Sequence, residues 1–147
     1  DYNGTNAQDN VVWIQDKHVV IFTSGNDIIA QRDDGSQYVF KDGHASDVSA
    51  LAVSYDNNLL ASCSATIDGE GTAPIILWNL DDNYSKKYEL RSHEIGVKTL
   101  LFSKDGEFLI SQSCNEERSL VVWDVEDGLV VKSTICPIPY SGITLLE

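Results

Sequence analysis

Two histidines occupy matching positions in the chain, and they are the residues whose type best suits chemical catalysis. His44 and His93 each stand four residues before a valine, Val48 or Val97, that opens an apolar run. Imidazole titrates near neutral pH and is the most frequent general acid or base in enzymes. Neither histidine has a nucleophile with a matched base beside it in the sequence. A structural role is therefore favoured for both, and also for His18 at the edge of an apolar strand.

Carboxylates offer a second kind of chemistry, because two short segments are rich in oxygen ligands. These segments are Asp68-Gly69-Glu70-Gly71 and Asp81-Asp82-Asn83. A calcium loop of the EF-hand type spaces its ligands regularly and ends on a bidentate glutamate, and neither segment has that pattern. The sequence also contains no phosphate-binding glycine loop, nucleophile elbow or zinc-binding helix signature. We expect an acidic insertion and a turn, with no metal, no cofactor and no enzymatic activity.

Charge and cysteine content narrow the class of partner. The chain has 23 acidic and 10 basic residues, for a formal charge of −13. Nucleic acids and anionic membranes are bound mainly through Lys and Arg, so both are disfavoured, and an acidic surface attracts basic patches on proteins. Surplus acid that only keeps the chain in solution is the alternative. Cys63, Cys114 and Cys136 form no CxxC pair, which favours reduced thiols in a cytosolic protein over zinc or disulfides.

Internal repetition decides the expected fold. The segment 43–54 matches the segment 92–103, with a histidine, a valine four residues later and an apolar run closed by serine. Turns follow, then the strands 59–64 and 108–113, and each unit reaches a tryptophan-bearing apolar strand, IILWNL or LVVWDV. The two histidines lie 49 residues apart and the two tryptophans, Trp78 and Trp123, lie 45 apart. This spacing is close to the period of roughly 40–45 residues that is typical of propeller blades.

Each unit is predicted to contain four short β-strands. The third strand is apolar on both faces, since Ile75 and Leu77 alternate with Ile76 and Trp78. Such a strand needs cover on both sides, which sheets stacked face to face provide. Trp78 and Trp123 are therefore predicted to be core residues. Trp13 lies in an earlier and more degenerate unit, where it either packs or anchors a partner.

From Gly43-His44 to Trp78-Asn79, and again from Ser92-His93 to Trp123-Asp124, the chain resembles WD repeats. The resemblance implies an all-β fold, a partial WD-repeat β-propeller of about three four-stranded antiparallel blades plus the first strand of a fourth. The expected segments are a leader or linker at 1–9, a degenerate blade at 10–42, WD-repeat blades at 43–91 and 92–135, and a linker with the next first strand at 136–147. The chain is expected to be a fragment of a longer propeller.

WD repeats also suggest a set of structural polar residues. A typical repeat links a loop histidine, a second-strand serine, a turn aspartate and the tryptophan by hydrogen bonds. The matching residues here are His44, Ser62, Ser64, Trp78, His93, Ser111, Ser113 and Trp123. The aspartate is missing, because Thr72 and Glu117 stand six residues before the two tryptophans. The loops 66–73 and 115–118 are longer than usual and are expected to break this geometry, so only part of the network is predicted.

The long loops also suggest a branch of the family and a surface. Together with the Gly43–Ser54 run, the second strand that precedes the glycine-rich insertion and the IILWNL strand, they resemble the cilia- and flagella-associated WD proteins and the echinoderm microtubule-associated-protein-like family. That similarity implies a non-catalytic scaffold that binds other proteins in a ciliary, axonemal, centriolar or other microtubule-associated assembly, with a cytoplasmic, cytoskeletal location. An adaptor in ubiquitin ligation, signalling or RNA processing remains the alternative. The residues predicted to contact a basic or polar partner segment are Asp68, Glu70, Glu116, Glu117 and Arg118.

Overall fold

The computed structural model describes residues 10–114 and 117–135, which form three four-stranded antiparallel sheets. In each sheet the strands are neighbours in chain order, so each sheet is an up-and-down meander. The single helical element of the described residues is a short 3-10 turn, η1, at Gln15–Lys17. The predicted all-β fold of three four-stranded units is confirmed. The strand predicted to open a fourth unit, Ile143 to Leu146, lies outside the described residues.

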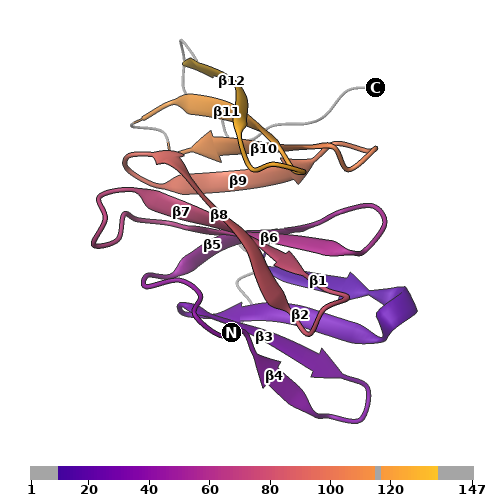
Figure 1. Ribbon diagram of the computed structural model, residues 1–147. Helices are drawn as coiled ribbons and strands as arrows, with labels where there is room; N and C mark the ends of the chain where they lie inside the picture. The colour runs from indigo at the N-terminus through magenta and orange to yellow at the C-terminus, as the bar shows by residue number, and fades with distance from the viewer. Residues whose placement is uncertain (1–9, 115–116, 136–147) are drawn as a thin grey trace.

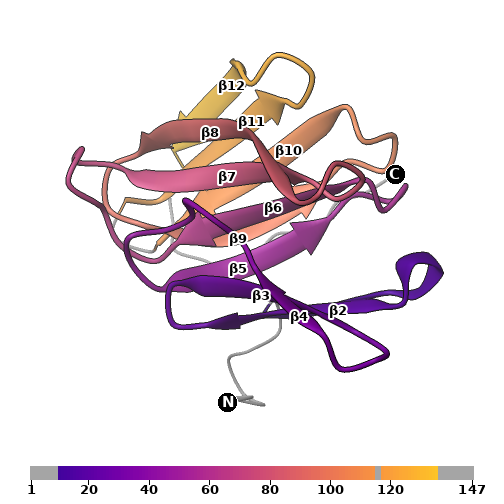
Figure 2. The same ribbon diagram turned by 60° about the horizontal axis from the view of Figure 1, so that its bottom comes forward.

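The sheets follow one another along the chain and stack face to face (Figure 1). The first contains β1 (Val11–Ile14), β2 (Val19–Ser24), β3 (Asp27–Arg32) and β4 (Gln37–Val39). The second contains β5 (Val48–Val53), β6 (Leu59–Ser64), β7 (Ala73–Asn79) and β8 (Ser85–His93), which lie side by side in Figure 2. The third contains β9 (Val97–Phe102), β10 (Phe108–Ser113), β11 (Ser119–Asp124) and β12 (Val130–Ile135). Strand β8 thus continues past residue 91, where the second blade was predicted to end.

Equivalent turns in the second and third sheets are built by the same hydrogen bonds. Between β5 and β6, Asp56 accepts hydrogen bonds from the Ser54 hydroxyl at 2.6 Å and the Asn58 backbone N–H at 3.0 Å. Between β9 and β10, Asp105 accepts the equivalent bonds from Ser103 and Glu107, at the same two distances. The sequence repeat is therefore reproduced at the level of local structure, because the same residue types satisfy the same turn.

The second sheet is covered on both faces, as its third strand predicted. Ile75 and Leu77 of β7 belong to the apolar cluster shared with the third sheet. Ile76 and Trp78 belong to the cluster shared with the first sheet. Six of the seven residues of β7 are buried, and the exception is Asn79 at its end. Two cores therefore meet in this sheet, and they fix the stacking of the three sheets by apolar burial on both sides.

The outer faces of the stack are more open. In β11, Val121 and Trp123 are buried against the second sheet, whereas Leu120 and Val122 on the other face are only half-buried. Every residue of β12 is exposed. Trp13 in β1 is 52% exposed on the first sheet. The reason is that, among the described residues, no further sheet covers either end of the stack.

Candidate functional site

Loops of the second and third sheets meet on the side of the stack where β5 and β9 begin and β6 and β10 end. The Ala65 N–H donates to the Asp47 carbonyl at 3.1 Å, and the Ser46 hydroxyl donates to the Thr66 carbonyl at 3.4 Å. In the next sheet, the Cys114 N–H donates to the Gly96 carbonyl at 3.0 Å. We call residues 43–47, 65–72, 94–96 and 117–118 the loop face. It contains the predicted binding residues that the structure describes, together with the loop histidine His44.

In the second sheet the loop histidine is tied to the second strand and the tryptophan. His44 shares hydrogen bonds with Ser64 Oγ through Nδ1, at 2.6 Å, and with Ser62 Oγ through Nε2, at 2.7 Å. Trp78 Nε1 donates to the same Ser62 Oγ at 2.9 Å. All four residues are buried. The structure thus brings these four predicted residues together, and the ring nitrogens of His44 are used to hold a loop rather than to face solvent.

The burial of His44 changes its protonation. Desolvation is the main cause and lowers the pKa of the imidazole from 6.5 to about 4. At neutral pH the ring is therefore uncharged, which suits a site where both ring nitrogens meet hydroxyl groups. A buried neutral histidine of this kind is poorly suited to exchange protons with a substrate.

In the third sheet the network contains one more member. Trp123 Nε1 donates to Ser111 Oγ at 2.9 Å, and Ser111 Oγ lies 2.7 Å from His93 Nε2. The other ring nitrogen, Nδ1, lies 2.9 Å from Glu117 Oε2. Because a carboxylate only accepts, Nδ1 carries a proton and donates to Glu117. Trp123, Ser111, His93 and Glu117 thus form a continuous chain of hydrogen bonds.

Ser113 is the predicted member that does not reach the ring in the way Ser64 does. Its Oγ accepts a hydrogen bond from the Ser119 backbone N–H at 2.7 Å and donates to the Cys114 carbonyl at 3.1 Å. The two repeats therefore complete their histidine networks differently. In the second sheet, Ser64 contacts Nδ1, whereas in the third sheet Glu117 and Ser119 both lie 2.9 Å from that nitrogen.

Both carboxylate oxygens of Glu117 are bonded within the fold. Its Oε1 accepts backbone N–H groups of Glu94 at 2.8 Å and Ile95 at 2.9 Å, while Oε2 bonds to His93 and the Ser119 hydroxyl. The loop was expected to break the network, but Glu117 stands where the turn acid is needed and its side chain reaches the ring. Burial raises its pKa, yet the bonds from Ser119, His93 and Ile95 outweigh burial and hold the pKa below its usual value.

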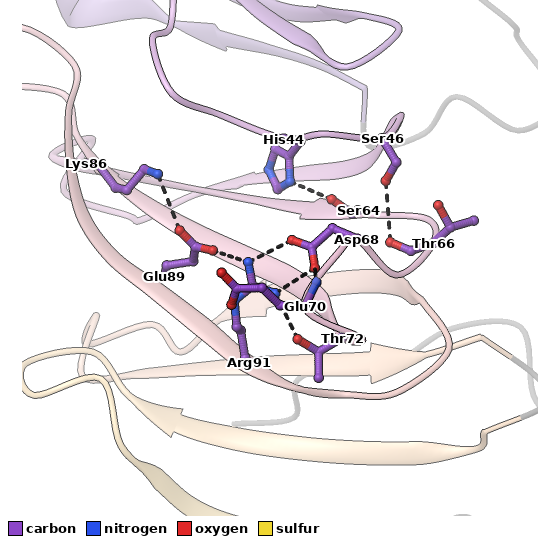
Figure 3. A network of polar contacts seen from close by, with 10 residues as sticks. All are labelled: His44, Ser46, Ser64, Thr66, Asp68, Glu70, Thr72, Lys86, Glu89 and Arg91. Atoms are coloured by element: carbon purple, nitrogen blue, oxygen red, sulfur yellow. Dashed lines mark hydrogen bonds and ion pairs between the residues drawn. The ribbon is translucent and has the colours of Figure 1, made fainter.

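The Asp68 side chain points toward Arg91, as Figure 3 shows. Arg91 of β8 donates to Asp68 Oδ2 at 2.7 Å and Oδ1 at 3.0 Å. The same guanidinium donates to the Thr72 hydroxyl at 2.8 Å, pairs with Glu70 at 3.2 Å, and bonds to Glu89. The hydrogen bond from Arg91 is the main cause that lowers the pKa of Asp68. The 66–73 insertion is therefore pinned to β8 by one arginine, which the repeat comparison did not single out.

The other three predicted loop residues differ in where they lie. Glu70 keeps 72% of its side chain exposed although it pairs with Arg91. Arg118 adopts a left-handed backbone conformation at φ 56°, and its N–H donates to the Cys114 carbonyl at 3.1 Å. Glu116 lies outside the described residues. Of the predicted acids that the structure describes, Glu70 is thus the one that it places outward.

The described parts of the chain hold no group of three or more His, Cys, Asp or Glu side chains arranged to bind a metal ion. None of their helices has the length and apolarity needed to cross a bilayer.

The low pKa of His44 leads to a pH prediction. The unfolded histidine takes up a proton near pH 6.5 but the folded one only near pH 4, so acid favours the unfolded state. We expect His44→Gln to remove a loss of about 2 kcal/mol in the free energy of unfolding that otherwise develops from about pH 8 to about pH 5. This window lies above the carboxylate range, and urea unfolding measured across it tests the effect.

The same substitution at His18, whose side chain is 68% exposed, is the control for losing a histidine. Parallel pH profiles for His44→Gln and the unsubstituted chain would contradict the prediction.

Comparison with known proteins agrees with the geometry. The sequence profile of the family described as "WD domain, G-beta repeat" matches residues 35–70 and 84–124. Cilia- and flagella-associated protein 52 of Chlamydomonas reinhardtii is 32% identical over 136 residues, which is 90% of this chain and 22% of that protein. WD repeat-containing protein 90 of Mus musculus is 29% identical over 143 residues, 97% of this chain and 8% of that protein. The chain thus spans less than a quarter of the length of either relative.

A solved structure shares the fold. The structure of U3-55K superposes with a TM-score of 0.71 at 24% identity, over 88% of this chain and 40% of that one. The predicted similarity to the cilia- and flagella-associated WD proteins is confirmed, and the similarity to the echinoderm microtubule-associated-protein-like branch stays a prediction. With two repeats that match the family profile, three stacked four-stranded sheets and a buried tryptophan network in two of them, the chain belongs to the WD-repeat family of β-propeller proteins.

Proposed function

We propose that the chain is part of a non-catalytic scaffold that holds other proteins in a ciliary, axonemal or other microtubule-associated assembly. The observation that carries this proposal is the use of the polar groups on the loop face. His44 and His93 are both bonded within the fold, and Glu117 is bonded to four donor groups. Because these side chains are hydrogen-bonded within the fold, they hold the loops in a rigid surface. Such a surface suits binding better than proton transfer.

The type of assembly is supported by the named ciliary relative. Cilia- and flagella-associated protein 52 matches nine-tenths of this chain. On this basis the proposed location is the cytoskeleton of the cytoplasm, in a cilium, flagellum or centriole. Because the relatives are much longer, residues 136–147 are proposed to link this part to a following blade.

The charge of the chain limits how it attaches. Microtubule surfaces are strongly acidic, and a formal charge of −13 opposes direct contact with them. Attachment through other proteins, or through other parts of the polypeptide, is therefore proposed. The exposed acids of the loop face favour partner segments that carry Lys or Arg.

A charge-reversal experiment tests this function in the full-length protein. Glu70→Lys with Glu94→Lys reverses two exposed acids of the loop face. We expect this pair to lower the recovery of co-purified partners about tenfold, since like charges then oppose a basic segment. The matched control is Glu107→Lys with Glu126→Lys, which reverses two exposed glutamates in the turns at the other end of the strands.

Two readouts decide the outcome. Mass spectrometry identifies the co-purified proteins, and microscopy locates the tagged protein. Ciliary or centriolar proteins that are lost with the first pair alone support the proposal. Ubiquitin-ligase, signalling or RNA-processing subunits, with no ciliary location, would replace it with an adaptor role. Equal recovery from both pairs would remove the loop face as the binding surface.

A further inference from the structure

Once the internal acids are set aside, the loop face displays a group of apolar side chains beside its exposed charged ones. Ile67 and Ile95 are each 46% exposed. Ala45, Ala65 and Thr66 are also exposed, and they lie in the same three loops. We call these five residues the isoleucine patch. A single exposed isoleucine is ordinary, but two on adjoining loops that the fold holds together are a feature of binding surfaces.

Close backbone contacts bring the three loops of the patch together. Gly96, which follows Ile95, is buried, and a Cβ atom added to it would lie only 2.1 Å from the Ala65 carbonyl oxygen. The Thr66 carbonyl accepts the Ser46 hydroxyl, as Figure 3 shows. The second and third sheets therefore touch through backbone at this point, and a side chain in place of the glycine hydrogen would separate them. This contact places Ile95 beside the loop that carries Ile67.

The loops that carry Ile67 and Ile95 are also held in place by side chains within the fold. Glu117 accepts the backbone N–H groups of Glu94 and Ile95, which fixes the loop of Ile95. Arg91 binds Asp68 and Thr72 on either side of the turn that follows Ile67. Residues 68–72 close on themselves by a hydrogen bond from the Asp68 N–H to the Thr72 carbonyl, at 3.0 Å. A partner that binds preformed loops avoids most of the entropy cost of ordering them.

The charge around the patch selects the chemistry of the partner. Asp47, Glu70 and Glu94 are exposed and lie in the same three loops as the patch residues, and the exposed cation Arg118 lies in the fourth segment of the loop face. The neighbouring cation Arg91 is already paired with Asp68, Glu70 and Glu89. An apolar centre with an acidic border matches an apolar side chain that has basic residues on both sides. It repels acidic segments by the same electrostatics.

We propose that the isoleucine patch is the docking site for a segment of a partner protein in which leucine or a similar apolar side chain is flanked by Lys or Arg. This proposal rests on the scaffold function and states which chemistry its loop face recognises. Asp68 and Glu117, two of the acids that the sequence offered for this contact, serve as internal clamps, and the contact itself is made by Ile67 and Ile95.

A peptide-binding experiment on the full-length protein tests the patch. The probe is a fluorescent peptide Lys-Lys-Leu-Leu-Lys-Lys, compared with Glu-Glu-Leu-Leu-Glu-Glu and Lys-Lys-Ser-Ser-Lys-Lys by anisotropy. We expect the first peptide to bind most tightly, and Ile67→Ser with Ile95→Ser to weaken it about tenfold or more. Tyr55→Ser is the matched control, because Tyr55 is 64% exposed in the turn between β5 and β6, away from these loops. Equal binding of the three peptides, or equal loss in the control, would overturn the proposal.

A crosslinking experiment localises the partner in cells and does not depend on the double variant. A photoreactive amino acid replaces Ile67 in one version of the full-length protein and Tyr55 in another. Crosslinked peptides from the first version that contain apolar residues beside Lys or Arg support the patch. Crosslinks to acidic or purely polar peptides, or none beyond those of the Tyr55 version, overturn it.

The two proposals fail in distinguishable ways. If the charge-reversed pair loses its partners while Ile67→Ser with Ile95→Ser keeps them, the isoleucine patch is wrong and the scaffold stands. If the patch crosslinks to basic and apolar segments of proteins outside any microtubule-based assembly, the proposed assembly is wrong and the recognition chemistry stands.

Discussion

Replacement of Trp78 by alanine is expected to lower the free energy of unfolding by about 3–5 kcal/mol, the cost typical of emptying a large buried aromatic site. The Trp78 side chain is 1% exposed and lies in the core between the first two sheets. Its ring meets Phe40 edge-on, with centroids 5.0 Å apart. Its Nε1 also donates to Ser62, so the substitution removes both packing and a buried hydrogen bond. Urea unfolding followed by circular dichroism measures the loss without depending on tryptophan fluorescence.

Two further substitutions separate the causes of that loss. Trp78→Phe keeps most of the apolar volume but removes the N–H donor, and it is expected to cost about 1–2 kcal/mol. Trp13→Ala removes a tryptophan that is 52% exposed and should change stability much less. If Trp78→Ala and Trp13→Ala lower the free energy of unfolding equally, Trp78 is not the central core residue of the stacked sheets.

The second large effect is expected at Glu117, where alanine should lower the free energy of unfolding by about 2–4 kcal/mol. The carboxylate accepts hydrogen bonds from the ring of buried His93, the Ser119 hydroxyl and the backbone N–H groups of Glu94 and Ile95. Truncation removes the acceptor of the Ser119 hydroxyl and of two backbone N–H groups, and it leaves Ser119 Oγ, 2.9 Å away, as the remaining contact of His93 Nδ1. Urea unfolding measures the change, and hydrogen exchange at the Glu94 and Ile95 amides should become faster.

Two control variants separate the contribution of the Glu117 charge from that of its side-chain length. Glu117→Gln keeps the length of the side chain and one accepting oxygen, so it should cost less than alanine. Glu126→Ala truncates an exposed glutamate of the same sheet and is expected to change stability by at most about 0.5 kcal/mol. A Glu117→Ala protein as stable as Glu126→Ala would show that the loop acid faces outward, as its place in the sequence first suggested.

Much of the fold could be predicted because its determinants are local and repeated. Alternating and doubly apolar strands set the sheets, and the Ser-x-Asp turns at Ser54 and Ser103 are stabilised within five residues. The recurrence of His44 and Trp78 as His93 and Trp123 predicted that consecutive four-stranded sheets stack on one another. Strand period and turn chemistry depend on near neighbours, so a single sequence displays them.

The surface was harder to predict from the sequence. Asp68 and Glu117 both looked like exposed acids of long loops, but each binds a partner more than twenty residues away. Arg91 lies on β8 and His93 at its end, so the orientation of both acids depends on how β8 passes the loops. The sequence of a loop does not show whether its carboxylate will bind a group of the same fold or face water.

The sequence by itself determined the all-β repeat architecture, the buried tryptophan strands and the histidine positions, because apolar periodicity and turn residues act over short distances along the chain. Tertiary structure alone decided which loop acids became internal clamps and which isoleucines remained in solvent. The physical reason is that burial and hydrogen bonding at the loop face depend on contacts between sheets, such as Gly96 against Ala65, that have no signature in either segment alone.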